Sequence, residues 1–599
     1  MTTNKLNEPL LTKFQKSSLR FPIPETVKTP WFKVANEDGL PTTLDYFDGS
    51  MIDAIEASAM AVPKKAIAYN FYGNKVTYKD FILQVHITAR ALVAYGVKPG
   101  DRVTVCMPNT PQALIMFYAC NRMGAVASMI HPLSGEEEIV NYINNANSVL
   151  CLTLLQFYPK FEKIMDRLSN KNLVICDITD GLVGAKKLLF PLTRKGVKPL
   201  PKNSMAIKWK DFILGGKKYR GEYIYHAKSD EIAAILYSGG TTGTSKGILL
   251  TNLNFNALAL QTGTAGECII PGHTMLSIMP VFHGFGLGVC IHTILYWGCT
   301  CILVPQFNVK TYCGLLKKYK PNLIAGVPTL YEALLRIEDA KTLDLSQLEG
   351  MFSGGDSLSV ELKTKVDEFI TAHGAKEQVR EGYGTTECVT ASCLTPRFKY
   401  KEGSIGIPFP DTYYKIVMPS THEEVPYGTI GEICIAGPTV MQGYMNNPKE
   451  TAQTLQLHED GLVWLHTGDL GTMDEEGFVY FKQRLKRMII TSGYNVYPSQ
   501  IENVLDSHPD VHMSTVIGVK DNYRMQRVKA IVVLKQGVEQ SEELKKDILA
   551  YCAERVAKYA VPRELEFRAD LPKTLVGKVA YTVLEREEEE KQKRENKTN

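Results

Sequence analysis

Short apolar runs alternate with amphipathic stretches along the chain from residue 51 to about residue 360. Residues 102–107 (RVTVCM) have the continuous apolar character of a buried strand, residues 111–126 have helical spacing, and residues 127–132 (ASMIHP) form the next apolar run. A strand, a helix and a strand at this spacing are typical of a βαβ unit with a parallel strand pair. The pattern therefore predicts an α/β fold for most of the chain.

The pattern changes near residue 400, where short strands and turns replace the helices. Apolar runs at 413–419, 431–438 and 478–484 predict a small β-rich subdomain. Beyond Arg484, strands are expected at 488–493, 514–520 and 529–535, and helices at 498–506 and 541–558. We therefore expect a large N-terminal domain of α/β subdomains plus a small β-rich subdomain, followed by a smaller C-terminal α/β domain.

The predicted domain limits follow these changes in pattern. They are an N-terminal extension at 1–50, the large domain at 51–484, the small domain at 485–585 and a charged tail at 586–599. The tail carries a block of charge without an apolar side, which is typical of a frayed helix or a disordered segment.

Composition narrows the class of protein. The chain has 599 residues, 44% hydrophobic and 22% charged, with a net charge of +4. These values are typical of a globular protein, and they argue against nucleic-acid binding, which usually requires a strongly basic face. The thirteen cysteines are irregularly spaced without a CxxC pair. We expect reduced core thiols in a cytoplasmic protein rather than a metal or disulfide framework.

Two segments bear on membrane contact. Residues 281–305 are apolar and long enough to imitate a membrane span, but Gly298 divides them into an expected buried helix and buried strand. Residues 181–220 mix basic and apolar side chains, which suits either a peripheral membrane patch or a solvated surface insertion. The N-terminus lacks the apolar run of a signal peptide. We expect no transmembrane segment, and peripheral membrane contact remains an open alternative.

A loop made almost entirely of Gly, Ser and Thr follows the apolar run that ends at Tyr237. It comprises Ser238, Gly239, Gly240, Thr241, Thr242, Gly243, Thr244, Ser245 and Lys246. Glycines let backbone amides approach an anion, hydroxyls donate hydrogen bonds and a lysine adds positive charge, so the loop predicts polyphosphate binding. It is not a Walker A loop, because Gly follows the lysine and a strand-like run comes next. The alternative is a flexible linker, but linkers rarely separate two apolar strands.

This loop and further motifs in matching order resemble the adenylate-forming (AMP-binding) superfamily, and acyl-CoA synthetases in particular. The other motifs are PVFHGFG at 280–286, GVPT at 326–329, SGGDSL at 353–358, GYGTTE at 382–387, YGTIGEICIAGP at 427–438, HTGDLG at 466–471, FKQRLKR at 481–487, SGYNVYPSQIE at 492–502 and LPKTLVGK at 571–578. The resemblance covers roughly residues 50–585. It implies that a carboxylic acid attacks ATP to give acyl-AMP, and that the thiol of coenzyme A then takes the acyl group.

The resemblance also implies roles for single residues. Nucleotide-binding positions would be Ser238 to Lys246, Gly355, Asp356, Gly382, Tyr383, Gly384, Asp469, Arg484, Lys486 and Gly493, and catalytic positions would be His283, Thr386, Glu387 and Lys578. Tyr383 would stack on adenine, and Thr386 would contact the α-phosphate. Glu387 would bind Mg2+, which prefers carboxylates and phosphates. Asp469 would accept hydrogen bonds from the ribose hydroxyls, assisted by Arg484.

The remaining implied roles concern the transfer step and the acyl group. Lys578 would place its ammonium group against the α-phosphate during adenylation. Lys486 would be the hinge of a mobile C-terminal lid, and the turn containing Gly493 would line a pantetheine tunnel. His283 would gate the acyl pocket. Tyr581 stands where the family commonly has Arg or Lys, which puts a local phosphate or surface contact in doubt.

The expected acyl pocket is lined by residues 283–290, 326–329 and 353–355, which carry no acidic side chain. An amino-acid substrate would need an acidic partner for its ammonium group, so that class is disfavoured. The small residues Gly326, Gly354 and Gly355 would leave room for a medium- or long-chain fatty acid. Two alternatives stay open: a fatty-acyl-AMP ligase that serves a carrier protein in trans, and a non-catalytic nucleotide-binding scaffold.

Overall fold

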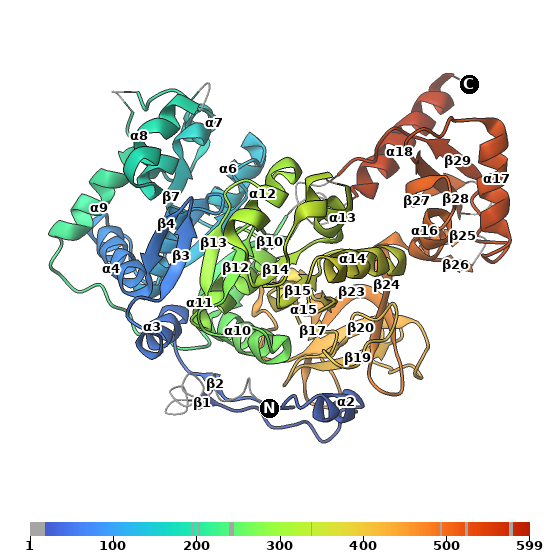
Figure 1. Ribbon diagram of the computed structural model, residues 1–599, viewed down its shortest axis with the longest axis horizontal. Coiled ribbons are helices and arrows are strands. Elements are labelled where there is room, and N and C mark those ends of the chain that lie inside the picture. Colours follow the sequence, from blue (N-terminus) through green and yellow to red (C-terminus); the bar gives the residue numbers. More distant parts are fainter. Residues whose placement is uncertain are drawn as a thin grey trace. The chain divides into compact units, whose positions relative to one another are not determined.

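The computed structural model describes residues 18–193, 197–201, 204–238, 245–336, 338–491, 494–521, 525–573 and 579–598. Packing divides the chain into two compact units, which are drawn in Figure 1. The first unit contains Met1–Tyr413 and Ile435–Leu465, and the second contains Tyr414–Cys434 and His466–Asn599. The α/β class predicted from the sequence is confirmed in both units.

One sheet of the first unit has eight strands in the order β21-β11-β10-β6-β5-β7-β8-β9. Its strands are β5 (Arg102–Cys106), β6 (Val126–Ile130), β7 (Ser148–Leu154), β8 (Leu173–Cys176), β9 (Ile207–Lys208), β10 (Ile232–Ser238), β11 (Lys246–Thr251) and β21 (Gly443–Tyr444). β5 and β6 are parallel and are joined by the helix α5 (Pro111–Arg122), which confirms the predicted βαβ unit. The Thr110 side chain caps α5, and every residue of the helix is buried.

A second sheet of nine strands has the order β18-β17-β16-β15-β14-β12-β13-β3-β4. Its strands are β3 (Ile67–Phe71), β4 (Asn74–Thr77), β12 (Thr274–Ser277), β13 (Thr300–Leu303), β14 (Leu323–Gly326), β15 (Gly350–Ser353), β16 (Val379–Tyr383), β17 (Cys393–Leu394) and β18 (Ile407–Pro408). The strands from β16 to β3 in this order pair in parallel. Their carboxyl ends therefore share one edge of the sheet, which is where α/β folds place ligands.

The apolar stretch 281–305 forms a buried helix and a buried strand, as predicted. The π-helix η4 (Phe285–Thr293) continues into α11 (Ile294–Tyr296), Gly298 turns the chain with φ +71°, and β13 follows. In the described part of the chain, no helix is long and apolar enough to cross a membrane. All thirteen cysteines lie among the described residues, are buried and form no disulfide, in agreement with the expected core thiols.

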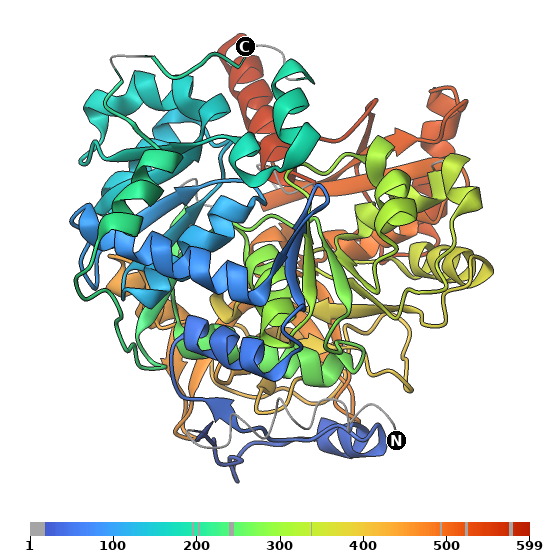
Figure 2. The ribbon, with the colours of Figure 1, turned by 60° about the vertical axis from the view of Figure 1, so that its left-hand side comes forward.

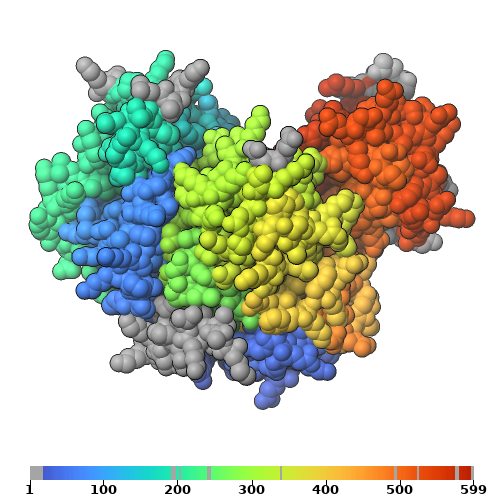
Figure 3. Space-filling view, viewed as in Figure 1, coloured from blue at the N-terminus to red at the C-terminus, as the bar shows by residue number. Residues whose placement is uncertain are grey.

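The segment 181–220 is only partly the surface insertion considered from the sequence. Its helix α9 (Trp209–Lys218) packs on α4 (Tyr78–Ala94), with Trp209 and Phe212 buried. A Cβ at Gly216 would lie 2.1 Å from the carbonyl oxygen of Ile87, so glycine permits the close approach of the two helices. In contrast, α8 (Gly184–Thr193) lies at the surface of the first unit, in the teal region at the upper left of Figure 3.

Residues 18–50 are part of the first unit. They contain β1 (Ser18–Leu19), α2 (Trp31–Glu37) and β2 (Tyr46–Phe47), coloured dark blue in Figure 2. Tyr46 is fully buried, and its hydroxyl donates to Oδ2 of Asp411 at 2.8 Å, while the Leu44 amide donates to the same oxygen at 2.7 Å. Burial raises the pKa of Asp411 to about 6.

The β-rich stretch predicted after residue 400 contains β19 (Tyr413–Val417), β20 (Gly431–Ala436), β22 (Leu455–Leu457), β23 (Val463–Met473) and β24 (Val479–Arg484). The C-terminal sheet of the second unit has the order β26-β25-β28-β27, with β29 beside β28. Its elements are β25 (Ile489–Thr491), β26 (Tyr494–Val496), α16 (Pro498–Asp506), β27 (Val511–Asp521), β28 (Met525–Leu534), α17 (Glu542–Ala553) and β29 (Glu564–Phe567). The charged tail continues the helix α18 (Tyr581–Thr598), in which Glu588 lies 2.7 Å from the buried Lys529 ammonium.

Candidate nucleotide and acyl site

The residues expected to bind adenine and the acyl group lie at the carboxyl edge of the nine-stranded sheet. Gly326 ends β14 opposite Ser353 at the end of β15, and Ser353 pairs with Glu381 near the end of β16. Tyr383 is the last residue of β16 and is half-buried. Parallel pairing therefore brings together three motifs that are separated along the sequence.

Glycines allow these motifs to pack closely. A Cβ at Gly354 would lie 3.1 Å from the Gly382 carbonyl oxygen and 3.9 Å from the Phe285 ring. Gly355 has φ +79°, and a Cβ there would lie 3.5 Å from Cγ1 of Val327. The three segments expected to line the acyl pocket therefore meet at one edge. Asp356 follows as an exposed residue of the loop.

The space beside Gly326 is not open. A Cβ at this position would lie 2.3 Å from Cδ2 of Leu330, on the helix α13 (Pro328–Arg336). The missing side chain at Gly326 thus lets Leu330 of α13 pack against the end of β14. The room for an acyl group that was expected at Gly326 is filled by Leu330.

His283 is half-buried in the turn that precedes η4. Its amide donates to the Pro280 carbonyl at 3.1 Å, and its Nδ1 accepts from the Phe285 amide at 3.2 Å. A neutral imidazole that accepts at Nδ1 carries its proton at Nε2. The backbone therefore selects the tautomer that presents an N–H donor on the other side of the ring.

The polyphosphate loop joins the ends of an antiparallel strand pair. Ser238 ends β10 directly opposite Lys246, which starts β11, so the strand predicted after the lysine is confirmed. Gly239, Gly240, Thr241, Thr242, Gly243 and Thr244 lie outside the described residues. The Tyr142 hydroxyl donates to Ser245 Oγ at 2.8 Å, which fixes one end of the loop.

Lys246 and Glu387 are linked through Tyr444, a residue that lies outside the family motifs. The Lys246 ammonium contacts the Glu450 carboxylate and lies 4.8 Å from the centre of the Tyr444 ring. The Tyr444 hydroxyl donates to Oε1 of Glu387 at 2.9 Å. β21 carries Tyr444 alongside β11, with Tyr444 opposite Ile248. The expected phosphate-binding lysine and the expected magnesium ligand thus flank one aromatic ring.

Thr386 and Glu387 lie in a tight turn with unusual backbone geometry. They belong to the 3₁₀ helix η6 (Thr386–Cys388), and the two following residues have φ values of 53° and 82°. A Cβ at Gly384 would lie 2.5 Å from the Thr390 carbonyl oxygen, so glycine is required there. Positive φ at residues other than glycine is uncommon and concentrates at functional sites.

In the second unit, Asp469 and Arg484 face each other across β23 and β24. Arg484 Nε lies 3.4 Å from Oδ1 of the buried Asp469, and the arginine side chain is half exposed. The Asp469 amide donates to Thr467 Oγ1 at 3.1 Å. Lys486 is exposed in the 3₁₀ turn η7 (Leu485–Arg487) that follows β24.

Lys578 and Gly493 lie outside the described residues, but the segment that carries Lys578 has defined ends. Lys573 pairs with Val579 in an antiparallel bridge, and the Ala580 amide donates to the Pro572 carbonyl at 2.7 Å. The ring of Tyr581 lies 4.6 Å from the guanidinium carbon of Arg487. At this position the family commonly has a cationic side chain, whereas here an aromatic ring contacts the cation of Arg487.

The fold and these motifs define a nucleotide-binding α/β protein. Residues 55–445 match the profile of the AMP-binding enzyme family, and residues 500–578 match that of the AMP-binding enzyme C-terminal domain. The chain therefore belongs to the AMP-binding enzyme family, and the resemblance seen in its motifs is confirmed.

Relatives named long-chain-fatty-acid–CoA ligase resemble almost the whole chain. The Bacillus subtilis (strain 168) protein is 35% identical over 566 residues, which cover 94% of this chain and 98% of that protein. An Escherichia coli O6:H1 protein is 32% identical and covers 88% of this chain and 93% of its own length. Among solved structures, ATP-bound MatB from Rhodopseudomonas palustris aligns with a TM-score of 0.76 at 25% identity, over 90% of this chain and 99% of MatB.

Proposed function

We propose that this chain is an ATP-dependent acid–thiol ligase that activates a medium- or long-chain fatty acid as acyl-AMP and transfers it to coenzyme A. One observation carries the proposal: the Tyr444 ring lies beside Lys246, at the end of the phosphate loop, and the Tyr444 hydroxyl donates to Glu387. The likeness to ligases named for long-chain fatty acids, at 35% identity over 94% of the chain, supports the substrate class.

The chemistry assigned to the nucleotide side follows from charge. The loop from Ser238 to Lys246 holds the β- and γ-phosphates, Thr386 contacts the α-phosphate, and Lys578 stabilises the charge that develops during adenylation. Glu387 fits a magnesium ion, because its carboxylate is half-buried and one oxygen is oriented by the Tyr444 hydroxyl. Bound magnesium would neutralise phosphate charge. Asp469 and Arg484 hold the ribose in this proposal.

The acyl side is built from uncharged groups. Phe285, Val327 and the glycines at 354 and 355 meet at the sheet edge, and the described segments 283–290, 326–329 and 353–355 carry no acidic side chain that would pair with an ammonium group. In this proposal the Nε2–H of His283 donates to an acyl carboxylate oxygen, because its Nδ1 accepts from the Phe285 amide. These features support an unsubstituted aliphatic acid over an amino acid.

ATP–pyrophosphate exchange over a panel of acids tests the proposal. The panel contains acetate, short-, medium- and long-chain fatty acids, aryl acids, bile acids and amino acids. Exchange is expected to be fastest with medium- or long-chain fatty acids, and steady AMP release is expected to require coenzyme A. Absence of exchange across the panel would indicate a non-catalytic scaffold, and AMP release that depends on a carrier protein instead of coenzyme A would indicate transfer in trans.

We further propose that α8 contacts membranes from which a fatty acid is taken. Leu188 and Leu189 are 78% and 57% exposed, and the exposed Lys187 adjoins them. Apolar side chains beside lysines match the interior and the anionic headgroups of a bilayer.

Sedimentation with vesicles of anionic phospholipid tests the contact. The double substitution Leu188→Ser with Leu189→Ser should weaken binding by at least about tenfold, since a fully buried leucine contributes about 1.5–3 kcal/mol. Leu83→Ser is the matched control, because Leu83 is 50% exposed on α4. Equal binding by all three proteins would refute the contact and leave the ligase proposal untouched.

A further inference from the structure

Three side chains that can ligate a transition metal converge inside the β-rich stretch of the second unit. Glu432 and Cys434 lie on β20 and point to the same side, two residues apart, and His466 lies on β23. All three are buried, with exposures of 5%, 0% and 7%. Their ligand atoms lie within 4.8 Å of one another.

Nδ1 of His466 lies close to both other ligand atoms. His466 Nδ1 lies 3.0 Å from Oε2 of Glu432 and 3.5 Å from Sγ of Cys434. In a tetrahedral zinc site, metal–nitrogen bonds of about 2.0–2.1 Å and metal–sulfur bonds of about 2.3 Å place nitrogen and sulfur about 3.5 Å apart. The same bond lengths place nitrogen and a carboxylate oxygen about 3.3 Å apart. The two distances from His466 Nδ1 are therefore within a few tenths of an ångström of those in a zinc site, and the oxygen of Glu432 and the sulfur of Cys434 lie within 4.8 Å of each other.

We infer that Glu432, Cys434 and His466 form a binding site for a divalent ion of the zinc class. One thiolate, one imidazole and one carboxylate make a mixed donor set that suits Zn2+ and excludes Mg2+ and Ca2+, which take oxygen ligands. The site is therefore distinct in kind from the magnesium position proposed at Glu387.

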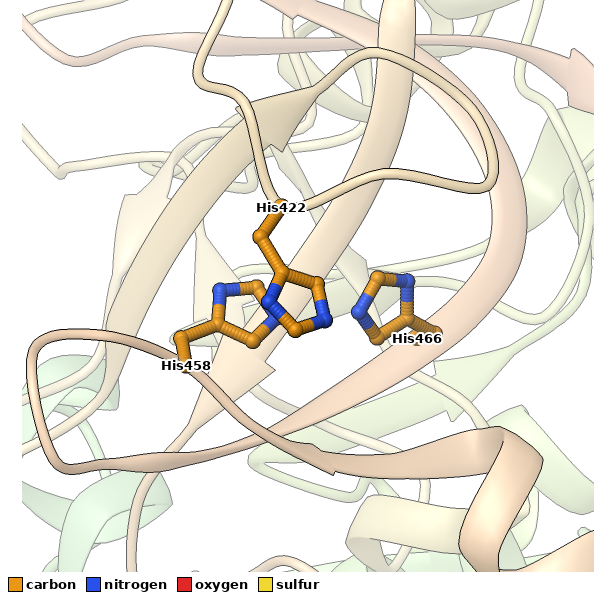
Figure 4. Close-up of side chains that lie close together, drawn as sticks. All are labelled: His422, His458 and His466. Atoms are coloured by element: carbon orange, nitrogen blue, oxygen red, sulfur yellow. The ribbon is translucent and has the colours of Figure 1, made fainter.

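A further histidine of the second unit lies close to His466. Figure 4 shows the rings of His422 and His466, whose centroids are 6.0 Å apart and whose ligand nitrogens lie within 4.8 Å. His422 is half-buried on the loop between β19 and β20. The third ring labelled in the figure, His458, follows β22 and packs on Trp464 with centroids 5.8 Å apart. These three histidines form a separate group from Glu432, Cys434 and His466. A water molecule can complete the tetrahedral shell of the proposed site.

The metal site connects to the expected ribose-binding residue. The second carboxylate oxygen of Glu432, Oε1, accepts from the Gly468 amide at 2.9 Å, and the Thr467 hydroxyl donates to the Ile433 carbonyl at 2.7 Å. Asp469 is the next residue along β23. An ion held by Glu432 and His466 would therefore stiffen the turn that presents Asp469.

Cobalt binding to the untagged, chelator-treated full chain tests the inference. Wild-type protein is expected to bind one equivalent of Co2+ with a near-ultraviolet band of thiolate-to-cobalt charge transfer. Cys434→Ser should abolish this band and weaken Co2+ binding by about tenfold or more, as the loss of supporting interactions alone costs metal sites about 10- to 100-fold. Cys552→Ala is the matched control, because Cys552 is another buried thiol of the second unit, on α17, and should keep the band.

The same contacts would also arise if the His466 Nδ1–H simply donated to both neighbours. In that case no thiolate band forms at one equivalent of Co2+, or an equal band persists in Cys434→Ser, and either result overturns the site. X-ray absorption at the zinc edge of the wild-type protein gives an independent answer if Cys434→Ser does not fold. One sulfur at about 2.3 Å supports the site, and a shell of only nitrogen and oxygen refutes it.

Discussion

Tyr444 offers the sharpest test of the nucleotide site, because its hydroxyl is the link between the phosphate loop and Glu387. Burial and the neighbouring Glu387 carboxylate raise the pKa of Tyr444, so the phenol stays protonated and donates at neutral pH. Tyr444→Phe removes the 2.9 Å hydrogen bond to Glu387 and retains the ring beside Lys246. The change therefore removes the hydroxyl's bonds to Glu387 and to the Thr454 side chain, and it leaves the contact with Lys246 in place.

The size of the effect follows from that bond. A hydrogen bond to a charged group contributes about 1.5–3 kcal/mol, and partners that orient metal ligands alter metal affinity by about 10- to 100-fold. We expect the Mg2+ concentration for half-maximal ATP–pyrophosphate exchange to rise by about 10- to 100-fold, with the rate largely restored at saturating Mg2+.

The matched control for this experiment is Tyr142→Phe. Its hydroxyl contacts Ser245 at 2.8 Å, so its loss should affect ATP binding at the loop and leave the Mg2+ requirement unchanged. An unchanged Mg2+ requirement in Tyr444→Phe, with a lower rate at every Mg2+ concentration, would refute the role given to the tyrosine.

Three further predictions concern other parts of the molecule. Lys578→Ala should lower the rate of acyl-adenylate formation by about 10²- to 10³-fold while thioester formation from supplied acyl-AMP continues; normal pyrophosphate exchange would contradict the assignment. Proline fixes φ near the value of the 3₁₀ turn η7 and so would block rotation at the expected hinge. Lys486→Pro should therefore slow the complete reaction by more than it slows one of the half-reactions measured alone. An equal loss of rate in the two half-reactions would argue against a hinge. The pKa of Asp411 is raised to about 6, above its unfolded value of about 3.9, so this group favours folding most below pH 4 and loses that contribution as pH rises to 6. Asp411→Asn should remove this part of the pH dependence of urea unfolding, and an identical profile in both proteins would show that another group causes it.

Local patterns predicted the elements that depend on neighbouring residues. The run RVTVCM and the helix after it form β5 and α5, and the strand expected after Lys246 forms β11. Periodicity suffices in these places, because burial on one or both faces restricts the side chains that an element can carry. The motif order likewise indicated the family, and the matched profiles confirm it.

Contacts between distant segments could not be predicted in this way. Lys246 meets Glu450 across 204 positions of sequence, and Tyr46 meets Asp411 across 365. Sequence periodicity predicts neither contact, because the pairing of β11 with β21 and the burial of Tyr46 depend on how whole elements pack. Gly326 makes the same point, because only the packing of α13 shows that Leu330 fills its side-chain space.

The sequence by itself therefore determined the α/β class, the order of the motifs and the Gly, Ser and Thr composition of the loop before Lys246, all of which depend on residues close together in the chain. The tertiary structure alone decided that Tyr444 joins Lys246 to Glu387, and that Glu432, Cys434 and His466 converge. The physical reason is that side-chain convergence depends on strand register. A shift of one residue would turn these groups to the opposite face of the sheet.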